Sequence, residues 1–153
     1  MDQERDLYFV AVKMFLTDEA GRLLITKDRF GDWDIPGGRL KEDDFLTSLE
    51  KVAEHKIIKE LGDDFRCQLG QPLVFMRHER NEILASGEKA KRRIFAIGYE
   101  AKYLGGEIKL DVNHERYEWV NPKTFNPADY FTGGWLAGVK NYIDIVKTRQ
   151  IEV

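Results

Sequence analysis

The chain has 153 residues, of which 42% are hydrophobic and 33% are charged. This balance is typical of a single soluble domain, here spanning residues 1–153, and it excludes a disordered chain. The 24 basic and 27 acidic residues give a formal net charge of -3, which argues against a protein that wraps duplex nucleic acid.

No feature of the sequence points to secretion or to a membrane. Cys67 is the only cysteine, so no disulfide can form within the chain, as is usual in a reducing cytoplasm. The first six residues are mostly charged, where a signal peptide needs an apolar stretch. No run reaches the roughly 18 apolar residues that span a bilayer. We therefore expect a cytoplasmic protein without membrane contact.

The N-terminal segments predict a β-hairpin followed by a glycine turn. Residues 7–16 are apolar and contain β-branched side chains, which is typical of a mostly buried strand. Polar and glycine residues at 18–21 predict a turn, and residues 22–27 (RLLITK) predict the paired strand. The segment WDIPGG at residues 33–38 then ends in Pro-Gly-Gly, which interrupts any regular element.

A helix is predicted from Ser48 to Leu61. Thr47 is placed to cap it while Glu50, three residues later, reaches back, which is the pattern of a capping box. Apolar side chains recur at positions 49, 53, 57 and 61 and form one ridge. Gly62 follows directly, where a glycine commonly ends a helix.

The second half of the chain alternates strands and loops and closes with a helix. Strands are predicted at residues 72–77, 93–104 and 117–120, with a polar loop at 81–91. A second amphipathic helix is predicted at residues 135–147. The order predicts the α/β (α+β) class, with a mixed sheet and helices on both faces.

Residues 33–62 resemble the signature of the Nudix hydrolase family. The entry WDIPGG at 33–38 is similar to the family's Trp-x-x-Pro-Gly-Gly lead-in, and HKIIKELG at 55–62 is in register with its Arg-Glu-apolar-x-Glu-Glu-x-Gly exit. The spacer is about three residues longer than the family's. Either Asp44 stands at its acidic position or Thr47 has taken that place. The strand ERYEWV at 115–120 and the helix after Gly133-Gly134 also resemble the family.

The resemblance implies a Nudix-type α/β/α sandwich that cleaves the pyrophosphate bond of a nucleoside diphosphate linked to another moiety. In that family, carboxylates on adjacent helical turns hold Mg²⁺ or Mn²⁺, which neutralises the phosphates and activates a water. A glutamate often serves as the general base. Members are often homodimers, so a homodimer is possible here.

The helix departs from the family pattern at its metal ligands. Lys56 and Lys59 replace two of three glutamates, His55 replaces the arginine, and only Glu60 matches. An ammonium cannot bind Mg²⁺ and repels it, so the metal site is expected to be divergent and weakened. Lys56 and Glu60 are four residues apart and could pair directly.

Candidate site residues follow from the resemblance and from the charge pattern. The glycine pair lets a ligand approach the backbone closely, and the basic segments at 77–80 and 89–93 suit phosphate. The candidates are Glu60 and Glu115 for catalysis, Glu60 and Glu118 for the metal, and Gly37, Gly38, Arg39, Lys56, Lys59, Arg77 and Arg93 for the substrate.

Two functions are consistent with this pattern. The first is a Nudix-type pyrophosphohydrolase with a divergent metal site. The second is an inactive Nudix-fold domain that binds a nucleotide or nucleotide sugar as a regulatory module, which the two lysines favour. A third and weaker hypothesis is a scaffold that uses the fold only for contacts with other proteins.

Overall fold

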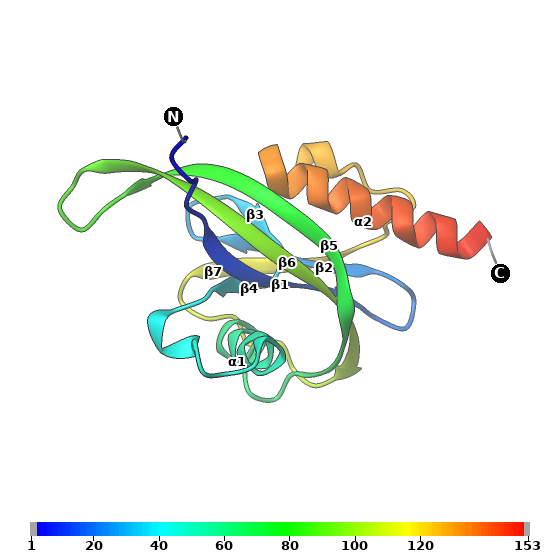
Figure 1. Cartoon of the computed structure of the whole chain (residues 1–153). Helices are drawn as coiled ribbons and strands as arrows, with labels where there is room; N and C mark the ends of the chain where they lie inside the picture. The colour runs from blue at the N-terminus through cyan, green and yellow to red at the C-terminus, as the bar shows by residue number, and fades with distance from the viewer. Residues whose placement is uncertain (1–2, 152–153) are drawn as a thin grey trace.

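Seven strands and two long helices make up the computed structural model, which describes residues 3–151 (Figure 1). The strands are β1 (Phe9–Thr17), β2 (Leu23–Asp28), β3 (Trp33–Asp34), β4 (Gly37–Arg39), β5 (Arg66–Ile83), β6 (Lys89–Gly105) and β7 (His114–Val120). The helices are α1 (Leu49–Leu61) and α2 (Gly133–Ile151), with short 3-10 turns at Glu42–Asp44 and Pro127–Asp129. Within this part of the chain, neither helix has the length and apolar character needed to cross a membrane.

The strands form one mixed sheet. Their order is β3-β2-β1-β6-β5, with β4 paired to β1 and β7 paired to β2. β1 and β6 run parallel, from Phe9 opposite Ile94 to Thr17 opposite Lys102, and the other pairings are antiparallel. The predicted hairpin of β1 and β2 is present, with Thr17 opposite Leu23.

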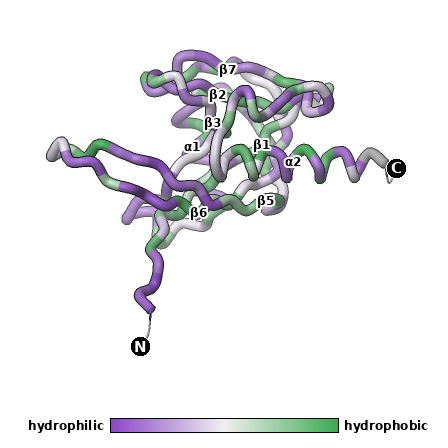
Figure 2. The backbone as a smooth tube through the Cα atoms, turned by 90° about the horizontal axis from the view of Figure 1, so that it is seen from above, coloured by the Kyte–Doolittle hydropathy of each residue, from purple (hydrophilic) through white to green (hydrophobic). Residues whose placement is uncertain are grey.

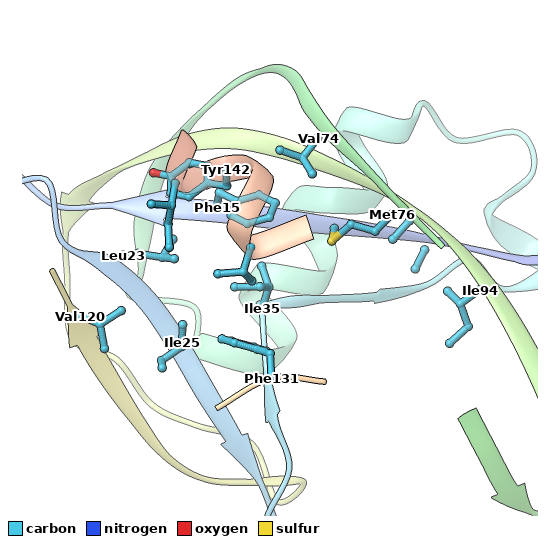
Figure 3. Close-up of a cluster of buried hydrophobic side chains, with 14 residues drawn as sticks. Phe15, Leu23, Ile25, Ile35, Val74, Met76, Ile94, Val120, Phe131 and Tyr142 are labelled. Atoms are coloured by element: carbon cyan, nitrogen blue, oxygen red, sulfur yellow. The ribbon is translucent and has the colours of Figure 1, made fainter. Parts of the chain in front are cut away.

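Each face of the sheet is covered by one helix, as the sequence predicted. Neighbouring residues of a strand point to opposite faces. Met14 therefore packs with Ile57 of α1, whereas Phe15 packs with α2. Figure 3 shows the cluster on the α2 side, where the Phe15 ring stacks on Tyr142 with 4.6 Å between ring centroids.

The helix α1 begins one residue later than the predicted capping box requires. Ser48 is the N-cap, and its hydroxyl accepts a hydrogen bond from the Lys51 N–H at 3.3 Å. The Thr47 N–H donates to the Asp44 carbonyl at 3.0 Å, so Thr47 belongs to the preceding turn instead. The predicted end of the helix is confirmed, because Gly62 stops it with φ 95°.

The prediction of a polar loop at residues 81–91 is wrong, because most of this segment is strand. β5 and β6 pair as far as Ile83 opposite Lys89, and only residues 84–88 form the turn. Figures 1 and 2 show this hairpin reaching beyond the rest of the sheet, hydrophilic over much of its length. The polar composition reflects solvent on both faces of the hairpin, since side chains there have no core to cover.

Candidate functional site

A pocket of about 270 Å³ opens where β4 lies beside β1. It brings together four of the predicted site residues, which are Gly37, Gly38, Arg39 and Glu60. The rest of its lining consists of Ala11, Lys13, Asp28, Arg29, Phe30, Asp34, Arg80, Ile94, Asn113, His114 and Trp135. The glycine turn and the end of α1 therefore meet in one cavity.

The glycine pair is fixed by its closeness to β1. Gly37 lies opposite Lys13 in the ladder and has φ 140°, a conformation that favours glycine. A Cβ atom at Gly37 would lie 2.0 Å from the Val12 carbonyl oxygen. The Met14 N–H donates to the Pro36 carbonyl at 2.8 Å and holds the chain against the strand. No larger residue fits here without moving β4.

Glu60 reaches the glycine pair from the last turn of α1. Its Oε2 accepts a hydrogen bond from the Gly37 N–H at 3.1 Å. Burial of the carboxyl raises the pKa of Glu60 to about 7, against the opposing effect of the nearby Lys13 ammonium, while Asp34 raises it further. Glu60 forms no ion pair with any residue of the described chain. It can therefore accept or release a proton near neutral pH.

A half-buried ion pair lines the pocket. The Lys13 side chain is 6% exposed, and its Nζ donates to both carboxylate oxygens of Asp34 at 3.0 Å. The same ammonium lies 5.1 Å from the ring centroid of Trp135 at the start of α2. The pair is neutral as a whole, and both its ammonium and its carboxylate line the cavity.

Trp135 is held in the pocket wall by His78. The two rings stack at 4.5 Å between centroids with 19° between planes. His78 Nδ1 also accepts hydrogen bonds from the N–H groups of Gly134 at 3.1 Å and Trp135 at 3.4 Å. Burial lowers the pKa of His78, which keeps the ring neutral and able to accept both bonds.

Lys56 also lies at the glycine pair, although it does not make the predicted contact with Glu60. Its Nζ is 3.8 Å from Asp44 Oδ2, and among the described residues no Lys56–Glu60 ion pair forms. A Cβ atom at Gly38 would lie 3.4 Å from the Lys56 Cδ, so the side chain covers that glycine. Of the two spacer residues considered for the acidic position, Asp44 is the one that forms an ion pair with a side chain of α1.

The remaining predicted residues lie outside the pocket lining. Lys59 and Arg77 are exposed. Arg93 pairs with Asp6 at 2.6 Å and with Glu79 at 3.0 Å. On β7, Glu115 lies 3.4 Å from Lys27 and Glu118 lies 3.0 Å from Arg116.

The pocket does not provide the donor set that a Mg²⁺ cluster needs. Among residues 3–151, no group of three His, Cys, Asp or Glu side chains is arranged to hold a metal ion. Glu60, Glu115 and Glu118 do not converge, because the two β7 carboxylates are outside the lining. Mg²⁺ requires several oxygen ligands in near-octahedral geometry, whereas the three carboxylates of the lining stand among four cationic side chains and are not grouped around one point.

Sequence reasoning missed the buried pair of Lys13 and Asp34 and the wall formed by Trp135 and His78. One signal for Lys13 was present, since it is the only charged residue within the apolar segment 7–16. A lysine inside a buried strand needs a partner, which marks it for attention. The partner, 21 positions away, belongs to β3 and comes beside Lys13 only when β2 pairs with β3 and β1 pairs with β4.

The fold is similar to solved structures of Nudix proteins. A MutT protein from Methanosarcina mazei Go1 aligns with a TM-score of 0.68, at 19% sequence identity over 97% of this chain and 99% of that chain. An ADP-ribose pyrophosphatase from Streptococcus suis gives a TM-score of 0.65, at 11% identity over 92% of each chain. A MutT NUDIX hydrolase from Burkholderia pseudomallei gives 0.60, at 20% identity over 89% of this chain and 98% of that chain.

No family model and no curated protein matches the sequence. The structural likeness nevertheless confirms the fold that the resemblance of residues 33–62 implied, which is a Nudix-type α/β/α sandwich with a mixed sheet.

Proposed function

We propose that this chain with the Nudix hydrolase fold binds a nucleoside diphosphate derivative in the pocket and hydrolyses its pyrophosphate bond. The observation that carries the proposal is the position of Glu60. Its carboxyl faces a cavity with cationic side chains, lies beside the Gly37 N–H, and has a pKa of about 7. A general base is most effective when its pKa lies near the working pH.

The charges of the pocket suit a diphosphate. Lys13, Arg29, Arg39 and Arg80 all line it, and cationic side chains stabilise the charge that develops on phosphate oxygens during transfer. Glu60 would take the proton from the attacking water while these cations hold the phosphates. The likeness to an ADP-ribose pyrophosphatase supports a substrate of this class.

A second function is favoured by the lysines of α1. Lys56 occupies the neighbourhood of Gly38 and pairs with Asp44, so an ammonium lies where the family's motif has a metal-binding glutamate. Such a site can hold phosphate oxygens without a divalent ion and without cutting the bond. The alternative is therefore a nucleotide-binding regulatory module.

A hydrolysis assay separates the two functions. The purified protein is incubated with a panel of nucleoside diphosphate derivatives that includes ADP-ribose, in Mg²⁺, in Mn²⁺ and in chelator. We expect phosphomonoester release, and we expect Glu60→Gln to lower kcat/KM by about 10² or more, the usual contribution of a general base. Glu54→Gln is the matched control, because Glu54 is exposed on the same helix and outside the pocket.

The same assay covers the other sequence-based candidates. Glu115→Gln and Glu118→Gln should reduce turnover only if β7 contributes to the reaction from outside the lining. If the wild-type protein binds members of the panel equally well with and without chelator but turns none of them over, the hydrolase is excluded and the binding module is supported. A cytoplasmic location and a homodimer remain part of the proposal, and sedimentation of the purified protein tests the latter.

A further inference from the structure

Three arginines from three strands lie close together, and two of them, Arg39 and Arg80, line the pocket. Arg80 of β5 lies directly opposite Arg92 of β6 in the antiparallel ladder. Arg39 of β4 and Arg92 share the ring of Phe9, with guanidinium carbons 5.3 Å and 5.4 Å from its centroid. Arg39, Arg80 and Arg92 are called the arginine cluster below.

The arginine cluster carries more positive charge than its neighbours neutralise. Glu82 pairs with Arg39 and lies 3.5 Å from Arg80. The other acidic residue of this part of the hairpin, Glu79, is engaged by Arg93 and by a lysine. Among the described residues, one carboxylate thus pairs with two of the three guanidinium groups, and no carboxylate pairs with Arg92.

The positive charges of the cluster also disfavour one another. Burial lowers the pKa of Arg39, and the charges of Arg80 and Arg92 lower it further. Like charges placed directly opposite each other in a sheet also weaken strand pairing, as for Arg80 and Arg92. A bound anion would offset the positive charge that Glu82 leaves over.

The cluster continues the site of the proposed diphosphate. Arg39 and Arg80 line the same cavity as Gly37 and Gly38. Since a strand rises about 3.3 Å per residue, the Arg39 backbone lies about 7 Å beyond Gly37 along β4. A ligand whose diphosphate sits at the glycine pair therefore has its next phosphate within reach of the arginines.

We propose that the arginine cluster is a subsite for a third phosphate, so that the preferred ligand carries a chain of at least three phosphates. This inference rests on the proposed function, which places a diphosphate in the pocket. Guanidinium forks match phosphate oxygens in pairs, and the cluster supplies two of them in the cavity lining and a third directly beside them. A simple diphosphate sugar would leave this charge unused.

Titration calorimetry with inorganic pyrophosphate and inorganic tripolyphosphate, both in chelator, tests the subsite. The wild-type protein should bind tripolyphosphate at least tenfold more tightly than pyrophosphate. Arg92→Gln should remove most of that preference. Glu82→Gln removes the competing carboxylate and should increase tripolyphosphate affinity several-fold, a gain that misfolding cannot produce. Arg22→Gln, an arginine paired with Asp18 away from the pocket, is the matched control.

The outcomes separate the subsite from the proposed function. Equal affinity for the two probes in the wild-type protein, or an unchanged preference in Arg92→Gln, would overturn the subsite and leave the diphosphate site intact. A wild-type protein that binds neither probe would overturn both proposals. A Glu82→Gln variant that binds tripolyphosphate more weakly would also refute the assigned role of the cluster.

Discussion

Replacing Glu60 by glutamine tests the electrostatics of the pocket through the stability of the fold. The glutamine keeps the size of the side chain and still accepts the Gly37 N–H. The pKa of this carboxyl rises from 4.5 to about 7 on folding, so the folded state binds its proton more strongly than the unfolded state. Glu60 therefore disfavours folding above pH 7, and the penalty disappears as pH falls below 4.5.

The size of the effect follows from the shift in pKa. A difference of about 2.5 pH units corresponds to about 3 kcal/mol, at about 1.4 kcal/mol per unit. The gain in stability of Glu60→Gln over the wild type should grow from about 1 kcal/mol near pH 5 to about 3 kcal/mol near pH 8. The wild-type protein loses this stability with rising pH, and the variant does not.

Urea unfolding followed by tryptophan fluorescence, in chelator and at a series of pH values, measures the difference. Glu54→Gln on the exposed side of α1 should show no comparable dependence on pH. If the gap between Glu60→Gln and the wild type stays constant from pH 5 to pH 8, the carboxyl is not the buried, proton-binding group described above.

Three further predictions address the rest of the site. Lys13→Met leaves the Asp34 carboxylate without its buried partner and should lower the free energy of unfolding by about 3 kcal/mol, measured with urea; a neutral result would contradict a buried pair. His78→Ala removes the acceptor of two N–H groups at the start of α2 and should cost about 1 kcal/mol. Because the pKa of His78 is lowered in the fold, the wild type loses this contribution as pH falls below 6.5, so the gap should shrink in acid. Lys56→Glu with Lys59→Glu should raise Mn²⁺ affinity in titration calorimetry, and no gain would count against the register of α1 with the family motif.

The local elements of the fold could be read from the sequence because their signals are local. The apolar ridge of α1 and the stop at Gly62 lie within 14 residues, and both are found in the structure. The glycine pair and Glu60 were matched to one motif, and the cavity brings them together. These features need only helix periodicity and the conformational freedom of glycine.

The parts of the site that the sequence did not place depend on register between distant strands. Glu118 of β7 lies opposite Ile25 of β2. The position of its side chain therefore depends on the register between these two strands. A shift of one residue in that ladder would turn every side chain of β7 to the other face. The pairing of Lys13 with Asp34 has the same origin, because it requires β1, β2, β3 and β4 to be in place.

The parallel ladder of β1 and β6 has a consequence for biosynthesis. Ile94 is synthesised about 85 residues after its partner Phe9. Pairing between residues so far apart in the sequence slows folding. Until β6 arrives, the apolar strand at the centre of the finished sheet has an open edge, which invites pairing with other chains. A nascent or truncated polypeptide that ends in the turn at 84–88 should therefore aggregate and depend on chaperones. In the completed chain, β6 pairs with this edge of β1.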